Sequence, residues 1–246
     1  MFEIQRLIMK RIIPANHTSL DYQSALESFV RAIHHKQKEN LKSVFLTGSY
    51  ARGDASDASD LDVWCIFGEI NVDVLSDVGR SARQLPIAYD QLEVNAQCLS
   101  VKELKSKQFY SWAENPIKAL EGVLLYGQDF FEDVSIVEVE LLYKKYLTDI
   151  LMSIRHYISV DEPVEKLSVA KLKMYILKPL MFPLRLERYC SCGFYPLTVN
   201  DLFLSYDNGL SKVIGFFIDP ERLEAEIRSN HRGLLRELHD LVMQLI

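Results

Sequence analysis

The stretch T-G-S-Y-A-R-G-D-A-S-D-A-S-D-L-D-V at residues 47–63 decides how this chain folds. An apolar run, Val44–Leu46, leads into it, and a second run, Leu61–Phe67, begins within its last residues. Short apolar runs bounded by glycine and polar residues are typical of buried β-strands. We therefore expect a strand, a tight turn that opens a short helix, and a second strand.

The turn between these strands carries the pair Gly48-Ser49. Glycine lets the backbone turn tightly and approach a ligand closely, and Ser49 adds a hydroxyl where the short helix begins. The N–H groups at such a helix start are expected to face outward. Because phosphate oxygens are natural partners for them, Gly48 and Ser49 predict a phosphate-binding turn.

Ten residues separate Ser49 from Asp60, which opens the triplet Asp60-Leu61-Asp62. Side chains at positions i and i+2 of a strand point to the same face, so the two aspartates should converge. Two carboxylates on one face repel each other unless a cation lies between them. Mg²⁺ prefers oxygen ligands and shares them with substrate phosphates, so we predict a magnesium site at Asp60 and Asp62 beside the turn.

Three segments, Gly48-Ser49, Ala51-Arg52-Gly53 and Ser59-Asp60-Leu61-Asp62, together resemble the signature of the DNA polymerase β-like nucleotidyltransferase superfamily. The form Gly-Ser-x-Ala-Arg-Gly is typical of its small bacterial members, which include kanamycin and other aminoglycoside nucleotidyltransferases. The resemblance implies that Asp60 and Asp62 bind metal. It also implies a third carboxylate on a later strand, in an apolar-acid-apolar setting.

Leu92-Glu93-Val94 fits that setting, so Glu93 is the candidate third carboxylate. Asp90 is the competitor, but we expect it in the turn before the strand. Glu93 would either share the metal or accept a proton from the acceptor, and the sequence leaves both roles open.

Two further cationic positions enter the predicted site. Arg52 follows the turn and could pair with a phosphate or brace Asp54 or Asp57 as a structural ion pair. The resemblance also implies a lysine from a helical second unit that touches the triphosphate. The candidates are Lys171, Lys173 and Lys178, and Lys178 is included in the predicted site.

The chain divides into two units at residue 133. In residues 1–133 the pattern predicts helices at 21–40 and 72–85 and strands at 42–46, 60–67, 91–99 and 122–127. A capping box at Ser100 and Glu103 predicts the start of a further short helix. This order of elements predicts an α/β nucleotidyltransferase fold with a mixed sheet. Residues 134–246 carry helical periodicity at 134–156, 164–190 and 223–246, which predicts an α-helical bundle. Pro179 and Pro183 should kink or interrupt the middle helix.

Composition agrees with the expectation of a cytoplasmic enzyme. The chain has 246 residues, of which 48% are hydrophobic and 25% charged, enough for a substantial core. No run approaches the ~20 apolar residues of a membrane span, and the first residues lack the pattern of a signal peptide. The four cysteines are expected to be reduced thiols.

Charge distinguishes among partners. The formal net charge is −6, and no basic stripe of the kind that tracks a nucleic-acid backbone is evident in the sequence. We therefore expect no nucleic-acid partner and no membrane partner. An acidic protein suits a cationic acceptor, which favours aminoglycoside-like molecules.

These patterns lead to one functional hypothesis and two alternatives. The hypothesis is Mg²⁺-dependent transfer of a nucleoside monophosphate, AMP from ATP or the equivalent from another nucleoside triphosphate, to a hydroxyl of a small acceptor, with release of pyrophosphate. The alternatives are an antitoxin-like or regulatory enzyme that AMPylates a protein, and a non-catalytic nucleotide-binding module. The identity of the acceptor and the oligomeric state stay open.

Overall fold

A computed structural model describes residues 21–85, 91–106, 109, 114–131, 135–160, 168–207 and 209–246. The chain divides into two compact units, Met1–Val134 and Ser135–Ile246. Each unit has its own hydrophobic core.

Unit 1 is built on a four-stranded sheet in the order β3-β2-β1-β4. Its strands are β1 (Leu41–Leu46), β2 (Leu61–Phe67), β3 (Val94–Ser100) and β4 (Val123–Gly127). Strand β1 is antiparallel to both β2 and β4, whereas β2 and β3 are parallel. This mixed sheet confirms the predicted fold class of the unit.

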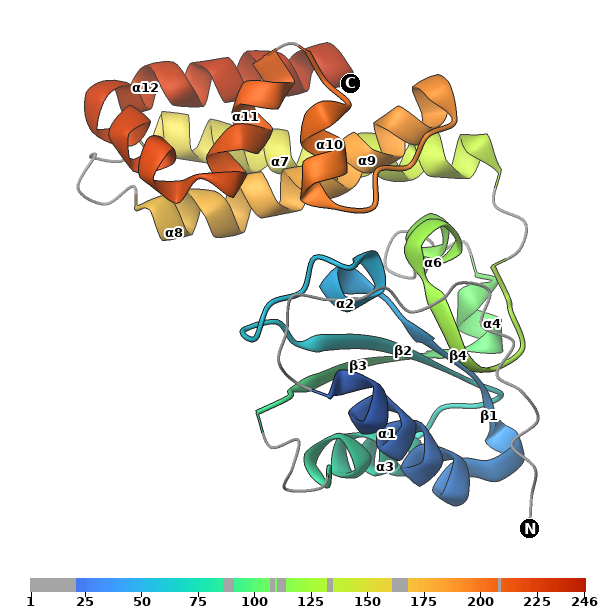
Figure 1. Ribbon diagram of the computed structural model, residues 1–246. Helices are drawn as coiled ribbons and strands as arrows, with labels where there is room; N and C mark the ends of the chain where they lie inside the picture. Colours follow the sequence, from blue (N-terminus) through green and yellow to red (C-terminus); the bar gives the residue numbers. More distant parts are fainter. Residues whose placement is uncertain are drawn as a thin grey trace. The chain divides into compact units, whose positions relative to one another are not determined.

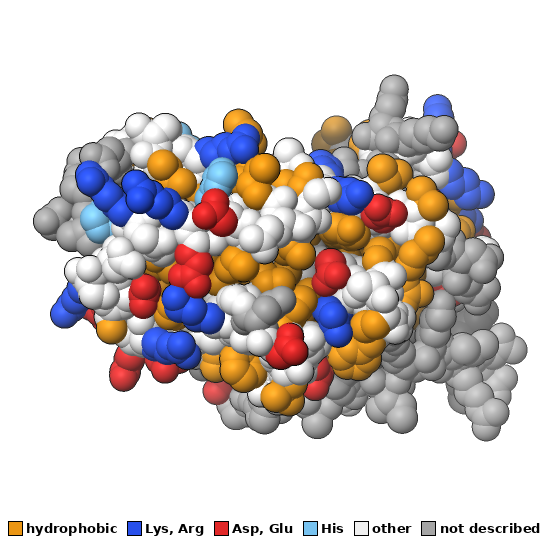
Figure 2. Space-filling view, turned by 90° about the horizontal axis from the view of Figure 1, so that it is seen from above, with side chains coloured by type: hydrophobic (Ala, Val, Ile, Leu, Met, Phe, Trp, Pro, Cys, Tyr) orange, Lys and Arg blue, Asp and Glu red, His pale blue; other side chains and the backbone are white. Residues whose placement is uncertain are grey.

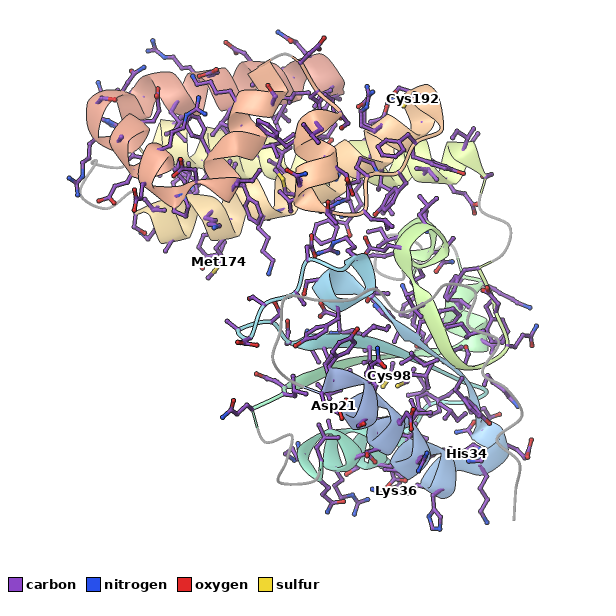
Figure 3. All side chains as sticks on the ribbon, viewed as in Figure 1. Asp21, His34, Lys36, Cys98, Met174 and Cys192 are labelled. Carbon is purple, nitrogen blue, oxygen red and sulfur yellow. The ribbon has the colours of Figure 1, made fainter. Side chains whose placement is uncertain are left out.

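Helices cover both faces of the sheet. Helix α1 (Tyr22–Gln37), which continues into a 3₁₀ turn at Lys38–Asn40, packs with α3 (Val72–Arg83) over the larger core (Figure 1). Figure 3 labels Asp21, which caps the first turn of α1, and His34 and Lys36 near its end. The opposite face carries a smaller apolar cluster, with α4 (Val101–Leu104) and α6 (Asn115–Glu121) on that side; its members include Phe45, Trp64, Ile66, Leu99, Leu104, Leu124 and Phe131.

Local signals account for several of these boundaries. Helix α2 (Gly48–Arg52) ends at Gly53, whose φ of 87° is in the left-handed region that glycine adopts without strain. Ser100 and Glu103 form the predicted capping box at the start of α4. Most bounds differ from the prediction by one to three residues; β3, for example, begins at Val94 instead of residue 91, and α6 has no counterpart among the expected elements.

Unit 2 is helical, as predicted. It contains α7 (Ile136–Ser159), α8 (Val169–Leu172), a π-helical turn (Lys173–Leu177), α9 (Lys178–Cys192), α10 (Val199–Leu204), α11 (Gly209–Ile218) and α12 (Pro220–Leu245). Helix α7 packs against both α9 and α12. The core between them is formed by leucine, isoleucine, valine, methionine and phenylalanine side chains.

The predicted middle helix, residues 164–190, departs from α-helical geometry at the π-helical turn, and only one of its two prolines lies next to that turn. Pro179 is the second residue of α9 and follows directly on the π-helical turn, so the departure from α-helical geometry lies just before this proline. Met174, labelled in Figure 3, lies in that turn and is 59% exposed. Pro183 lies inside α9 without ending it. The cap-like run at residues 195–201 also predicts a short helix that ends near Gly209; α10 ends at Leu204 instead, and a further helix, α11, begins at Gly209.

Two expectations from composition can be compared with the structure. All four cysteines are free thiols, including Cys98 and Cys192, which Figure 3 labels. Burial raises the pKa of the Cys98 thiol to about 11. Among the helices of the described ranges, none combines the length and apolarity needed to span a bilayer.

Candidate active site

The turn at Gly48 lies against Asp62. Gly48 has a φ of 72°, and a Cβ atom built on it would lie 2.1 Å from Oδ2 of Asp62. The preceding residue, Thr47, donates its backbone N–H to the carbonyl of Asp62 over 2.9 Å. Only glycine combines the left-handed backbone with space for that carboxylate. The antiparallel pairing of β1 and β2 therefore places the predicted phosphate turn directly beside a predicted metal ligand.

Asp60 and Asp62 converge on a single amide group. Nδ2 of Asn95 lies 3.4 Å from Oδ2 of Asp60 and 3.2 Å from Oδ1 of Asp62, so it donates to both carboxylates. Asn95 lies on β3 directly opposite Asp62 in the parallel register. The strand periodicity of the Asp-Leu-Asp triplet thus produces a pair of neighbouring carboxylates at the start of β2.

Glu93 is near this pair but does not complete a cluster of three. It directly precedes β3, is exposed, and accepts the Leu61 N–H on its backbone carbonyl over 2.8 Å, which places it beside Asp60 in the register. Throughout the described ranges, no three His, Cys, Asp or Glu side chains are gathered closely enough to hold a metal ion. In the register of β2 and β3 the amide of Asn95 lies opposite Asp62, and Glu93 lies beside Asp60.

The role of Glu93 stays a prediction. Glu93 also lines a cavity of about 430 Å³, together with residues of β3 and of α3, on the face of the sheet that α3 covers. The competing residue, Asp90, lies outside the described residues.

A buried carboxylate that the sequence did not point to supports the turn. Glu121, the last residue of α6, is fully buried, and its Oε1 accepts the Gly48 N–H over 3.3 Å and Nη1 of Arg52 over 3.0 Å. The Gly48 N–H is thus directed to Glu121, and the expectation that it faces outward is wrong. A carboxylate buried in protein needs such donors, and Gly48 supplies one of them.

Arg52 takes the structural role that the sequence left open. Its side chain is 10% exposed and forms ion pairs with Glu121 and with Asp54, whose Oδ1 lies 3.4 Å from Nε of Arg52. The guanidinium therefore links the end of α2 to α6. A contact between Arg52 and a phosphate remains a prediction.

Lys118, one turn before Glu121 on α6, is another buried charged residue. Its amine lies 3.4 Å from the centre of the Trp64 ring, on the strand that carries Asp62, and has no hydrogen-bond partner among the described residues. Burial lowers the pKa of Lys118 to about 7, against the opposing effect of the Glu114 and Glu121 carboxylates. Lys118 therefore fixes α6 against β2 with an amine that titrates near neutrality.

The remaining predicted residues are accessible. The Ser49 hydroxyl makes no hydrogen bond to any residue that the structure describes, so it is available to a ligand. In unit 2, Lys178 is exposed at the start of α9, and Lys171 is exposed on α8. The amine of Lys173 lies 4.8 Å from the centre of the Phe217 ring. A contact between Lys178 and a triphosphate remains a prediction.

The donor set around Asp62 is suited to a hard divalent cation. Two neighbouring carboxylates lie beside one neutral amide, so four carboxylate oxygens are gathered at the start of β2. Oxygen donors of this kind are those that Mg²⁺ uses when it also takes ligands from a substrate. Asp60 and Asp62 therefore fit the ion that the family resemblance implies, with Glu93 as a further candidate ligand.

Asn95, Glu121 and Lys118 were missed by the sequence analysis. For Asn95 a signal existed, since it lies two residues after Glu93 and so shares its face of the strand. Glu121 and Lys118 lie on a short helix without a clear periodic pattern. Their burial against α2 and β2 is a tertiary effect that no local pattern indicates.

Comparisons with known proteins agree with this geometry. Residues 26–122 match the family model described as a nucleotidyltransferase domain. The chain is 31% identical over 107 residues to the putative protein adenylyltransferase MJ0604 of Methanocaldococcus jannaschii, in an alignment that covers 44% of this chain and 100% of that protein. The crystal structure of spectinomycin adenyltransferase AAD(9) from Enterococcus faecialis, with ATP and spectinomycin, superposes with a TM-score of 0.52 and 12% identity, covering 88% of this chain and 98% of that chain.

The two kinds of similarity support different conclusions. At 12% identity the likeness to AAD(9) concerns the fold, and it extends over both units of the chain. The likeness to MJ0604 spans the whole of that relative at 31% identity. The matched family range holds the Gly48 turn, the Asp60–Asp62 pair and Glu121. This chain therefore belongs to the nucleotidyltransferase family and is an enzyme of that class.

Proposed function

We propose that this enzyme transfers AMP from ATP to a hydroxyl group of a small-molecule acceptor, with Mg²⁺, and releases pyrophosphate. The observation that carries the proposal is the contact between the Gly48 turn and Asp62, where the position of a Gly48 Cβ lies 2.1 Å from a carboxylate oxygen. A phosphate-binding turn and a pair of carboxylates in direct contact are what a nucleotidyl transfer site requires.

Each residue of the site has a task in that reaction. Asp60 and Asp62 hold Mg²⁺, which when bound neutralises charge on the phosphates. Ser49, whose hydroxyl is accessible, donates to the β- or γ-phosphate. Asn95 orients both aspartates through its amide. These residues bind and align the triphosphate, and alignment supplies much of the rate in phosphoryl and nucleotidyl transfer.

The chemical step is a displacement at the α-phosphorus of ATP. The acceptor oxygen forms a new bond to phosphorus, and the bond between the α-phosphorus and the bridging oxygen of pyrophosphate breaks. The acceptor proton passes to the Glu93 carboxylate, which is exposed beside Asp60. Lys178 from unit 2 pairs with the triphosphate. These two roles are assigned by the family resemblance together with the accessibility of both side chains.

The acceptor class follows from charge and from the fold. The acidic balance of the chain, −6, favours a cationic acceptor. On the face drawn in Figure 2, Lys and Arg side chains are interspersed with Asp and Glu, a distribution unlike the basic stripe of a nucleic-acid-binding surface. AAD(9), which shares the fold over both units, was solved with ATP and spectinomycin. We propose an aminoglycoside-like molecule as the acceptor, and the cytoplasm, which supplies ATP, as the place of the reaction.

A protein acceptor is the second candidate, and one observation favours it. The relative that is 31% identical is named as a putative protein adenylyltransferase, and the chain covers all of its length. In that case the hydroxyl would belong to a side chain of a partner protein, and the same residues of unit 1 would act on ATP.

One experiment separates these possibilities. The purified chain is incubated with Mg²⁺ and ATP and a panel of aminoglycosides, spectinomycin and lincosamides, and pyrophosphate release is followed with Asp62→Asn as the inactive control. Release with a small molecule that gains the mass of AMP supports the proposal. An AMP adduct found only on proteins of a lysate would support the second candidate. Binding of Mg²⁺ and ATP without pyrophosphate release for any acceptor would identify a non-catalytic module.

A further inference from the structure

Glu121 is the most deeply buried carboxylate near the candidate site. Its relative exposure is 0%, and it lies at the end of α6, 73 residues from Gly48 in the sequence. A buried carboxylate is costly unless its oxygens accept hydrogen bonds or ion pairs. The groups that satisfy Glu121 are therefore tied to it firmly.

One oxygen of Glu121 joins both ends of α2. Oε1 accepts the N–H of Gly48, the first residue of that helix, over 3.3 Å and Nη1 of Arg52, the last residue, over 3.0 Å. Two contacts at opposite ends of a five-residue helix restrain its orientation as well as its position. The turn that carries Ser49 is restrained with it.

Gly48 is held from a second side by Asp62. The position of its Cβ would lie 2.1 Å from Oδ2 of Asp62, while its N–H is directed to Glu121. Gly48 therefore lies between two carboxylates, one from the candidate metal site and one from α6. A displacement of α2 away from Glu121 would change the spacing between the Ser49 hydroxyl and Asp62.

Helix α6 is itself fixed to the strand that bears Asp62. The amine of Lys118 lies 3.4 Å from the centre of the Trp64 ring, and Trp64 follows Asp62 by two residues on β2. Through α6, Glu121 thus fixes the position of the phosphate turn relative to β2, the strand that carries Asp62.

We propose that Glu121 is a positioning residue, which sets the Gly48-Ser49 turn at its distance from Asp62 so that one triphosphate can contact both. The inference deepens the proposed function and rests on it. Glu121 touches no substrate and acts through Gly48 and Arg52. Its contribution therefore depends on hydrogen-bond acceptance and not on its charge toward the nucleotide.

The test compares the affinity for Mg²⁺ and ATP in three variants by isothermal titration calorimetry, at a temperature where circular dichroism shows each to be fully folded. Glu121→Ala should weaken binding about tenfold or more, since it releases both ends of α2. Glu121→Gln keeps an accepting oxygen and should stay within about threefold of the unmodified chain. Ile117→Ala truncates a buried apolar residue of the same helix; it should lower thermal stability and leave affinity unchanged.

The outcomes separate this inference from the proposed function. Failure of the unmodified chain to bind Mg²⁺ and ATP would overturn both. Normal binding by the unmodified chain with equal affinity in Glu121→Ala would overturn only the role of Glu121. Equal losses in Glu121→Ala and Ile117→Ala, or a loss in Glu121→Gln as large as in Glu121→Ala, would also overturn it. Loss in Glu121→Ala with recovery in Glu121→Gln supports it.

Discussion

The two units of this enzyme bury different kinds of side chain. Of the seven buried polar or charged residues in the described ranges, six lie in unit 1 and one, Arg185, lies in unit 2. Three of the six, Thr47, Lys118 and Glu121, surround the Gly48 turn and the strand that carries Asp62. Burial of a polar group lowers stability unless a partner offsets it, so these groups mark where unit 1 gives up stability for a site.

The difference explains where similarity to other proteins is concentrated. Residues 26–122, which match the nucleotidyltransferase family model, lie entirely within unit 1. Contacts such as those of Gly48 with Asp62 and Glu121 depend on particular residue types. An apolar core like that of unit 2 tolerates many combinations of similar volume. Unit 2 can therefore keep its fold while its sequence changes.

Asp62→Asn tests the functional side of this comparison most strongly. Loss of one charged ligand should lower the rate of AMP transfer at least about 1000-fold, because an amide cannot replace a carboxylate toward a divalent ion. Thermal stability should hardly change, since the side chain is at the edge of the core. Quenched-flow measurement of pyrophosphate release, with differential scanning calorimetry alongside, checks both parts. Turnover close to that of the unmodified chain would remove Asp62 from the site.

Leu184→Ala is the matching change in unit 2. Leu184 is fully buried in the helical core, so its truncation should lower the free energy of unfolding by about 2–5 kcal/mol. Affinity for Mg²⁺ and ATP should change little in the folded variant, because the residues predicted to bind them lie in unit 1 except for Lys178, an exposed residue at the start of the helix that carries Leu184. Urea denaturation and calorimetric titration measure the two quantities. A large loss of affinity with little loss of stability would contradict the division between the units.

Gly48→Ala should affect both stability and function. The left-handed backbone and the contact with Oδ2 of Asp62 should cost about 1–3 kcal/mol of unfolding free energy. Displacement of the turn should also weaken binding of Mg²⁺ and ATP. Gly193→Ala is the control, since Gly193 has a similar φ of 73° but open space around its Cβ position. Equal effects in the two variants on nucleotide affinity would show that the contact with Asp62 has no functional weight.

Lys178→Ala tests whether unit 2 also contributes a functional residue, which would weaken the contrast between the two units. If the amine pairs with the triphosphate, affinity for ATP should fall about tenfold, the value of one charge-assisted hydrogen bond. Lys171→Ala, which removes a lysine exposed on the preceding helix, serves as the control. Unchanged affinity in Lys178→Ala would exclude this lysine and leave ATP binding to unit 1.

Lys118→Met measures how much one buried charged group, the Lys118 amine, lowers the stability of unit 1. The pKa of Lys118 is about 7 in the folded chain and near 10.5 when exposed, so the unfolded chain binds more protons between these values and stability rises with pH across that window. Between pH 7 and pH 8 this contributes on the order of 1 kcal/mol, which Lys118→Met should lack. Urea denaturation at both pH values, with the exposed Lys102→Met as control, measures it. The same pH slope in Lys118→Met would contradict the lowered pKa.

The sequence predicted what depends on local patterns. The Asp60–Asp62 pair follows from strand periodicity, and the start of α4 follows from the capping residues Ser100 and Glu103. Glu93 was selected by a family pattern, but its place relative to Asp62 depends on the register of β3 against β2. That register sets Asn95, not Glu93, opposite Asp62. A shift of one residue in a strand changes every partner, and no local signal specifies it.

Residues that support the site from a distance were the least predictable. Glu121 contacts residues 69 and 73 positions earlier in the chain, and it lies on a helix that periodicity did not indicate. In unit 2 the helical class was evident, yet helix α11 was missed. Its sequence from Gly209 to Ile218 is short and mostly apolar, with Ser211 and Lys212 as its polar side chains, so the periodic pattern covers few residues.

The π-helical turn at Lys173–Leu177 changes the positions of Lys171 and Lys178 around the helix axis relative to each other. Residues seven apart share one side of an uninterrupted α-helix, and Lys171 and Lys178 have that spacing. The wider turn between them shifts the phase of everything that follows it. The two positions therefore do not share one side of the helix, and a relative with an uninterrupted α-helix here would present another side chain where this chain has Lys178.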